Sequence, residues 1–324
     1  MRRPAENAPA AEGGILLRDV YIINPKAGKK NTAVFFMERA KAFHAAHGGD
    51  YALCLTQREG HGEALAREAA AQGGPVRLWA VGGDGTLLEV VRGAANCENA
   101  AVGVFPCGSG NDFVRTLGGR EIFMNFERQH RGTAVPIDMI RTEHGDAVNI
   151  CSLGFDAKVA DEMTRYKHLP AVSGELAYTL SLAKCFFGKL ADPMTVTITD
   201  ENGAVERHSG EFMFALAGNG RWYGGGYCGA PKAQLADGLL DFVLIRRPPY
   251  YRIPFLVGRY KRGEHIDDAR FVDLLVYRRG TRIEIESTAE MVSNMDGNCV
   301  RTRRETYTVM PGALRLILPE GVRL

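Results

Sequence analysis

The sequence predicts an α/β N-terminal domain built on a parallel sheet, followed by a β-rich, sandwich-like C-terminal domain. Three observations support this fold class. Apolar β-type runs alternate with helical patterns from residue 18 to about residue 140. Beyond residue 141, β-type runs follow one another with one long helical pattern among them. The chain has 324 residues, a length typical of two domains.

The N-terminal half contains four strand candidates rich in β-branched and aromatic residues. They cover residues 19–24, 51–56, 76–81 and 100–105. Helical patterns follow them, over residues 32–47, over residues 62–72, from residue 86 through residue 95, and in a short stretch after residue 112. Strands that alternate with helices imply a parallel sheet with helices on both faces.

Two of these helices have recognisable ends. The pair Gly73-Gly74 is expected to stop the second helix, because glycine is a weak helix former. Thr86 and Glu89 match the capping-box pattern, which predicts the start of the third helix.

The C-terminal half contains a predicted hairpin and further strands. "MTVTITD" and "AVERHS" flank the turn sequence "ENG", and together they predict the hairpin. Further strands are expected over residues 211–219, 239–247, 271–279, 281–287 and 306–318. The helical pattern in this half covers residues 170–190.

These patterns predict the domain limits. Residues 1–15 are expected to be a disordered tail, and residues 16–140 the α/β domain. Residues 141–305 are expected to form the β-rich domain. Residues 306–324 are a candidate for packing back on the first domain.

Composition excludes several classes of protein. The net charge is +2, which implies no polyanion partner, so no nucleic acid is expected. The seven cysteines form no CxxC pair, and this argues against a zinc site or a disulfide framework and for a reducing compartment. No apolar run approaches the roughly 20 residues that span a bilayer. We expect a cytoplasmic protein. Peripheral contact with the inner face of the membrane is compatible with that location.

Three strand-to-helix turns carry glycines: "NPKAGKK", "GGDGTLLE" and "PCGSGNDF". In a parallel sheet such turns lie along one edge, where ligands bind. Glycine lets backbone amides approach a phosphate, and the helix behind each turn adds positive potential. The alternative is that all three are only tight connections. Neither GxxxxGK[ST] nor GxGxxG is present at the expected place, so both common nucleotide motifs are excluded.

These three motifs, in this order and spacing, resemble the diacylglycerol kinase catalytic domain. "NICSLGFDAKVA" and "APKAQLADGLLDFVLI" extend the resemblance to soluble bacterial diacylglycerol and lipid kinases, relatives of sphingosine and ceramide kinases. NAD kinases share GGDGT. The resemblance implies an NAD kinase/diacylglycerol kinase-like first domain and an ATP-dependent lipid kinase. Diacylglycerol is the leading substrate, and its product would be phosphatidic acid.

The resemblance also implies which residues contact ATP. They are Asn24, Pro25, Lys26, Ala27, Gly28, Thr56, Gly83, Asp84, Gly85, Thr86, Leu87, Leu88, Glu89, Gly108, Ser109, Asn111 and Asp112. Ser109 stands where threonine is common, and it keeps the hydroxyl. Asp84 has a physical role here, because a carboxylate at the tip of a glycine loop can hold Mg²⁺ between phosphates. The alternative is an Asp-Gly turn that satisfies its own backbone.

Other acids match family positions. The resemblance implies a structural Mg²⁺ site formed by the Asp237 carboxylate and the carbonyls of Gln234 and Leu239, although "ADG" also fits a plain turn. Asp138 matches an acid near the family's active site, and a solvated strand end is equally consistent with the sequence.

One departure bears on catalysis. Asp296 and Gly297 match the family's Asp-Gly-Glu, but Asn298 replaces the glutamate that accepts a proton. An amide cannot take up a proton at neutral pH. We expect weak lipid kinase activity, in which Asp296 either accepts the proton as a substitute base or holds the lipid hydroxyl through water. An NAD-kinase-like enzyme of a small molecule, or a nucleotide- or lipid-binding protein without activity, are the alternatives.

Two stretches are candidates for lipid contact. Residues 170–190 are apolar with few charges, and residues 248–265 mix aromatic side chains with arginine and lysine. Such mixtures suit an anionic membrane surface. Both also fit a core helix or a solvated face. A homodimer is left open.

Overall fold

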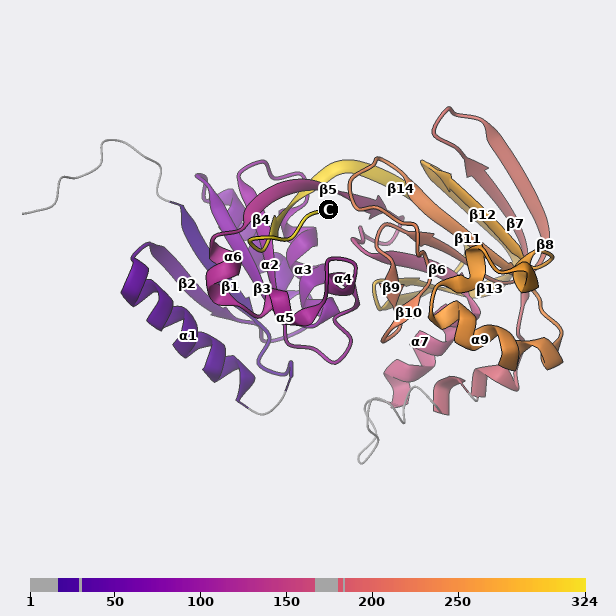
Figure 1. Cartoon of the computed structure of the whole chain (residues 1–324), viewed down its shortest axis with the longest axis horizontal. Coiled ribbons are helices and arrows are strands. Elements are labelled where there is room, and N and C mark those ends of the chain that lie inside the picture. The colour runs from indigo at the N-terminus through magenta and orange to yellow at the C-terminus, as the bar shows by residue number, and fades with distance from the viewer. Residues whose placement is uncertain (1–16, 29–30, 167–179, 183) are drawn as a thin grey trace, which may run out of the picture.

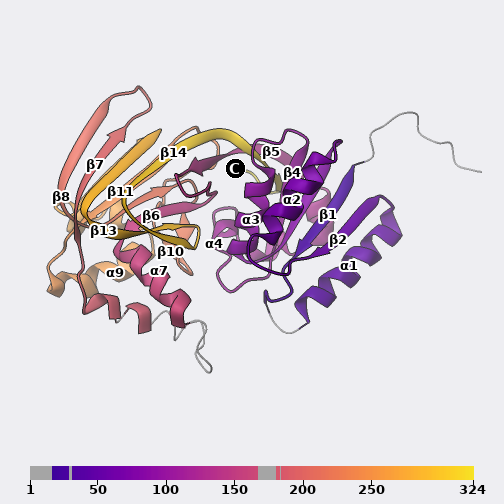
Figure 2. The ribbon, with the colours of Figure 1, turned by 180° about the vertical axis from the view of Figure 1, so that it is seen from behind.

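The computed structural model describes residues 17–28, 31–166, 180–182 and 184–324 (Figure 1). It has an α/β lobe and a β-rich lobe, and two long strands run from one to the other (Figures 1 and 2). This architecture confirms the predicted fold class. The expected tail at residues 1–15 lies outside the described residues.

The α/β lobe is built on four parallel strands in the order β4-β3-β1-β2. The strands are β1 (Arg18–Ile23), β2 (Asp50–Leu55), β3 (Val76–Gly82) and β4 (Ala100–Pro106). The helices are α1 (Thr32–His47), α2 (His61–Ala71), α3 (Asp84–Ala94), α4 (Asp112–Arg115), α5 (Arg120–Phe123) and α6 (Phe126–His130). The four predicted strands and three long helices are confirmed, with ends that differ by at most two residues. The short helices α5 and α6 were not predicted.

Both faces of the parallel sheet are buried. Along β1, Val20 and Ile22 belong to one apolar cluster, with side chains of α2 and α3. Tyr21 and Ile23 belong to a second cluster, with side chains of α1 and α6. This period of two explains why the strands read as continuous apolar runs.

The longer of the two strands that run between the lobes is β14 (Asn298–Leu318). It pairs antiparallel with β13 (Arg282–Met295) and with β5 (Thr133–Arg141). Near its end Leu316 pairs with Val102 of β4, so residues 306–318 extend from the β-rich lobe into the α/β lobe. The result is one continuous sheet of 12 strands.

The β-rich lobe is antiparallel. Its further strands are β6 (Ile150–Gly154), β7 (Asp192–Thr199), β8 (Val205–Gly218), β11 (Leu240–Arg246) and β12 (Leu275–Gly280), with a small pair of β9 (Trp222–Tyr223) and β10 (Tyr227–Cys228). The β7–β8 hairpin is confirmed. The two strands expected over residues 204–219 are one strand, because Gly210 adopts φ +150° without ending the pairing. The strand expected from residue 271 begins at Leu275.

Two helices flank this lobe on the same side, α7 (Phe155–Tyr166) and α9 (Ile253–Lys261), and neither was predicted from the sequence (Figure 1). Short 3₁₀ turns surround α9: η1 (Tyr250–Arg252), η2 (Glu264–Ile266) and η3 (Ala269–Phe271). Much of the helix expected over residues 170–190 lies outside the described residues; residues 180–182 and 184–186 are helical. Within the described ranges, no helix combines the length and apolar character needed to cross a membrane.

Candidate active site

A cleft of about 2270 Å³ brings the three glycine loops together with residues of the β-rich lobe. Every ATP-contacting residue implied by the resemblance lines it, as do Asp296 and Asn298. Gln234, Asp237, Leu239 and Asp138 are not in its lining. The cleft therefore lies at the carboxyl edge of the parallel strands, where the sequence predicted a ligand site.

The loops approach so closely that glycine is required. A Cβ built on Gly108 would lie 2.4 Å from the Cα of Gly83, and one built on Gly28 would lie 2.8 Å from the Cys107 carbonyl oxygen. Gly28 also has φ +77°, a conformation that disfavours other residues. The backbones of the three loops therefore face the cleft without side chains between them.

Two asparagines shape these loops. Asn24 donates from Nδ2 to the Thr86 hydroxyl at 3.2 Å and accepts from the Lys26 amide at 2.9 Å. Asn111 holds both backbone groups of Gly108, accepting at 3.0 Å and donating at 2.6 Å. Both side chains thus fix loop geometry, and a contact to ATP would come in addition to these bonds.

The start of α3 differs from the prediction. Its N-cap is Gly83, and Thr86 lies inside the helix, so the capping box is wrong. The Glu89 carboxylate instead accepts from the amides of Gly60 and Gly62, at 2.9 Å and 2.7 Å, and so caps α2. The side chains of Leu87 and Leu88 are buried in the core. The side chains of Leu87, Leu88 and Glu89 therefore support the loop before α3. The sequence around Glu89 could not reveal this role, because the amides that bind Glu89 belong to the start of α2.

Asp84 and Asp112 form an acidic pair beneath the loops. Asp84 Oδ1 accepts from the Phe113 amide at 3.4 Å, and Asp112 Oδ2 accepts from the Gly225 amide at 2.7 Å. Burial raises the pKa of Asp84 above its ordinary value. Burial also raises the pKa of Asp112, and the neighbouring charge of Asp84 raises it further.

This pair fits a divalent cation. Asp112 Oδ1 is buried and forms an ion pair with Arg115, whose Nε atom lies 3.1 Å away. No ion pair to Asp84 forms among the described residues. Burial and mutual repulsion disfavour the charged form of these two carboxylates. A bound Mg²⁺ would offset the repulsion, so the pair is suited to bind this cation.

The Asp296 carboxylate accepts more hydrogen bonds than a carboxylate that is available to act as a general base. It lies in the turn between β13 and β14, in a left-handed conformation with φ +51°. Its Oδ2 accepts from the amides of Val148 and Asn149, at 2.7 Å and 3.0 Å, and its Oδ1 accepts from Ile150 at 2.7 Å. Burial nevertheless raises the pKa of Asp296, against the effect of these amides.

Sequence reasoning missed two features of the cleft. The glycine run 224–226 matches no nucleotide motif, yet Gly225 supplies the amide that holds Asp112. Asp156, at the start of α7, lines the cleft, and burial raises its pKa to about 6. Near it the hydroxyls of Tyr223 and Tyr260 lie 3.0 Å apart. No local motif marks Asp156, because its burial depends on strands and helices distant in sequence.

Apolar side chains line the part of the cleft that borders the β-rich lobe. They include Phe155, Val159, Met213, Ile253, Leu256 and Tyr260. The cleft thus combines polar loops and acids with an apolar part formed by α7, α9 and β8.

In the loop of residues 234–239, the carboxylate expected to hold Mg²⁺ has an arginine as its partner. Asp237 Oδ2 forms an ion pair with Arg279, and Asp237 Oδ1 accepts from the Leu239 amide at 3.0 Å. The arginine already supplies the positive charge that a cation would bring. Asp138 anchors this loop by accepting from the amides of Gly238 and Gly312, at 2.7 Å and 2.8 Å. It is buried and outside the cleft, so a solvated strand end is wrong.

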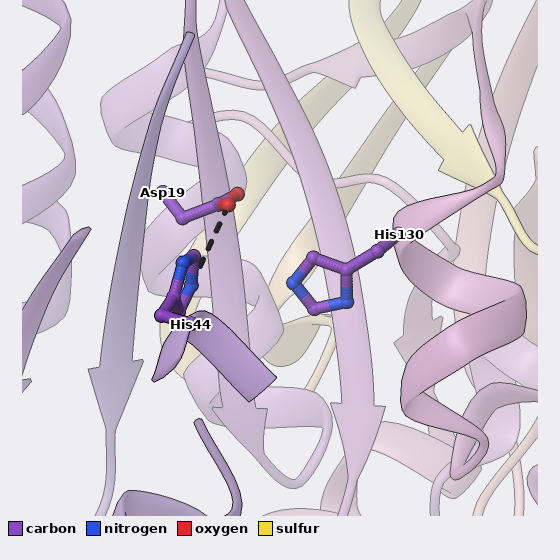
Figure 3. A group of neighbouring side chains, drawn as sticks. All are labelled: Asp19, His44 and His130. Atoms are coloured by element: carbon purple, nitrogen blue, oxygen red, sulfur yellow. Dashed lines mark ion pairs between the residues drawn. The ribbon is translucent and has the colours of Figure 1, made fainter. Parts of the chain in front are cut away.

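A second group of potential metal ligands, Asp19, His44 and His130, lies near the opposite ends of the strands (Figure 3). Asp19 binds the Arg77 guanidinium through two contacts of 2.7 Å. The Tyr21 hydroxyl lies 3.1 Å from His44 Nε2 and 2.7 Å from His130 Nε2. Arg77 thus contacts Asp19, and Tyr21 contacts both histidines. We assign these three side chains a structural role in the core.

Comparison with known proteins identifies the family. The family model "Diacylglycerol kinase catalytic domain" matches residues 19–142, and "YegS C-terminal NAD kinase beta sandwich-like domain" matches residues 117–318. A probable YegS-like lipid kinase of Pseudomonas aeruginosa strain PAO1 is 31% identical over 276 residues, which cover 85% of this chain and 86% of the relative. The diacylglycerol kinase of Bacillus subtilis is 27% identical over 301 residues, 90% of this chain and 95% of the relative.

A solved structure agrees in fold. A putative diacylglycerol kinase from Bacillus anthracis superposes with a TM-score of 0.73 at 22% identity, covering 96% of this chain and all of the other. The likeness extends over both lobes and over the strands that join them. The chain therefore belongs to the diacylglycerol kinase catalytic-domain family, in the group with a YegS-type C-terminal domain.

Proposed function

We propose that the protein transfers the γ-phosphate of ATP to the hydroxyl of a lipid, with diacylglycerol as the leading substrate and phosphatidic acid as its product. The observation that carries this proposal is the cleft, which joins phosphate-binding glycine loops and an acidic pair to an apolar pocket. ATP would lie on the loops, and acyl chains would lie between α7, α9 and β8. The lipid would come from a membrane surface.

The loops supply most of the catalysis in this account. Backbone amides at the start of α3 would hold phosphate oxygens, because the side chains that would exclude them are absent. Asp84 and Asp112 would hold Mg²⁺, which neutralises negative charge on the transferred phosphate when it is bound. Phosphoryl transfer depends mainly on positioning and charge, so these elements account for the larger part of the rate.

The hydroxyl oxygen of the lipid would attack the γ-phosphorus while the bond to ADP breaks. The Asn298 amide oxygen would accept a hydrogen bond from that hydroxyl, and the proton would leave to water. Asp296 would position the turn that carries Asn298, since three backbone amides already occupy its oxygens. Because backbone amides hold both of its oxygens, we assign Asp296 a positioning role in place of the role of substitute base.

The test is transfer of radiolabel from ATP to a panel that contains diacylglycerol, monoacylglycerol, a ceramide, a sphingoid base and NAD. We expect labelled lipid and no labelled NAD. Label in NAD alone would favour the small-molecule kinase. ATP binding without transfer to any acceptor would favour a binding protein, the alternative that Asn298 supports.

Replacing Asn298 tests the account of the proton. Asn298→Glu is expected to raise lipid phosphorylation by about tenfold or more, because general-base help contributes roughly 10²–10⁴-fold in other enzymes. Asn298→Gln is the matched control, as it adds the same length without a charge, and it should not raise the rate. Equal rates for both variants would show that proton removal does not limit turnover.

A further inference from the structure

We propose that α9 and the neighbouring residues around Phe187 form a docking face that lies on a lipid bilayer. This inference rests on the proposed lipid kinase function, because the bilayer is the source of the substrate. We define the docking face as the following exposed side chains, with their exposed fractions: Phe187 (87%), Tyr251 (74%), Phe255 (72%), Tyr250 (48%) and Val257 (39%).

The outward side of α9 is apolar from Pro254 to Gly258, and the basic residues of the helix, Arg259 and Lys261, lie in its last turn. Ile253, Leu256 and Tyr260 point into the protein and are buried. The outward positions carry Pro254, Phe255, Val257 and Gly258, with Lys261 at the end of the helix. A helix in contact with water on one side normally has charged or polar residues there. An apolar outward side indicates that another apolar phase covers it.

The exposed residues form one surface. The Phe186 ring lies edge to face with Phe187 and with Tyr250, and each pair of ring centroids is 5.8 Å apart. These contacts join the segment at residues 184–187 to η1, which leads directly into α9. Figures 1 and 2 show α7 and α9 along the same edge of the β-rich lobe. These apolar side chains are therefore placed to contact a flat surface, such as that of a bilayer, at the same time.

The docking face continues into the cleft. Inward side chains of the same two segments, Leu182 from one and Ile253, Leu256 and Tyr260 from the other, line the apolar part of the cleft. Tyr250, Tyr251, Phe255 and Phe187 are outside that lining. A lipid in a bilayer under the docking face would thus meet apolar walls that lead toward the glycine loops.

The charges near the docking face favour a membrane over a second copy of the chain. Arg247 precedes η1 and Lys261 ends α9; both are exposed, and neither forms an ion pair with a described residue. Arginine, lysine and tyrosine beside apolar residues suit the headgroup region of an anionic bilayer. A two-fold contact would bring the same cations of both copies onto one surface, which costs free energy.

Vesicle sedimentation of the full chain tests the proposal. The probes are phosphatidylcholine vesicles with and without phosphatidylglycerol. The double variant Tyr251→Ser/Phe255→Ser is expected to lower binding by about tenfold or more, since two large apolar side chains leave the interface. Val205→Ser is the control, because Val205 is 65% exposed but lies on β8, outside the cleft lining, and it should bind like the wild type.

Two further measurements separate this inference from the proposed function. Phosphate transfer to a short-chain diacylglycerol dispersed in water should be unchanged in the double variant, while transfer to vesicle diacylglycerol should fall with binding. Face-dependent vesicle binding without transfer to any lipid would support the docking face and overturn the kinase. Unchanged vesicle binding by the double variant would overturn the docking face, and so would a wild-type dimer in sedimentation velocity that the double variant dissociates while vesicle binding persists.

Discussion

Asp84 and Asp237 both precede glycine, and we expected Mg²⁺ near each: at Asp84 from the chemistry of a carboxylate beside a glycine loop, and at Asp237 from the family resemblance. The structure surrounds them differently. Asp84 lies in the cleft beside Asp112, and burial raises the pKa of both carboxyls. Asp237 is exposed and pairs with Arg279. The same local pattern therefore gives one acid without an ion pair among the described residues and one that pairs with an arginine.

The difference shows what an Asp-Gly pattern can indicate. Gly238 adopts φ +74° and permits the turn after Asp237, whereas Gly85 is the second residue of α3 and has no positive φ. Whether the carboxylate binds metal depends on the charge that the rest of the fold places beside it. Arg279 lies 42 residues from Asp237 in sequence, in a strand whose pairing no local signal predicts.

The largest effect that distinguishes the two acids is on activity. Asp84→Asn is expected to lower lipid phosphorylation by roughly 10²–10³-fold, because the charge beside the transferred phosphate is lost. Asp237→Asn is the matched control and should retain near-wild-type turnover. Initial rates at saturating ATP over a series of Mg²⁺ concentrations provide the measurement. Wild-type turnover of Asp84→Asn at limiting Mg²⁺ would remove the contrast between the two loops.

A smaller effect concerns the thermal stability of an Arg279 variant and the response of its Tm to Mg²⁺. In an Asp84→Asn background, which removes the metal response of the cleft, Arg279→Gln should lower Tm by about 3 °C. It should also make Tm rise with Mg²⁺, because Asp237 and the buried Asp241 lose their positive neighbour.

Asp237→Ala combined with Arg279→Gln is the control, and it should abolish that rise. The opposite outcome is a Tm that already rises with Mg²⁺ in the Asp84→Asn protein and stops rising when Asp237→Ala is added. That result would restore the structural metal at this loop.

The smallest effect extends the comparison to Asp156, a cleft acid that forms no ion pair with the described part of the chain. Burial raises its pKa to about 6, so the folded protein binds this proton more tightly than the unfolded chain does. Its contribution to the free energy of unfolding therefore falls as pH rises from about 4 to 6. Asp156→Asn should raise Tm at pH 7.5, by on the order of 2 °C relative to its effect at pH 4.5.

Thermal unfolding of wild type and variant across this pH range measures the difference. A variant whose Tm differs from that of the wild type by the same amount at every pH would show that Asp156 titrates alike in folded and unfolded chains.

Apolar runs and helical patterns alternate regularly in the first half of the chain, so its fold could be predicted from the sequence. Apolar runs such as residues 76–81 are buried on both faces, so strand, loop and helix alternate visibly in the sequence. The three glycine loops were found for the same reason: each lies directly between a strand and a helix. In the second half, α9 was missed because its apolar residues face both the core and the solvent, and no polar side marks a helix.

The sequence by itself determined the order of strands and helices in the α/β lobe, the glycine loops and the presence of Asp84 among them. These depend on interactions between residues close in the chain. Only the tertiary structure decided the partners of each acid: Gly225 for Asp112, 113 residues away, and Val148 to Ile150 for Asp296, at 146 to 148 residues. Electrostatic compensation acts through space, so it depends on which distant strands the fold brings together.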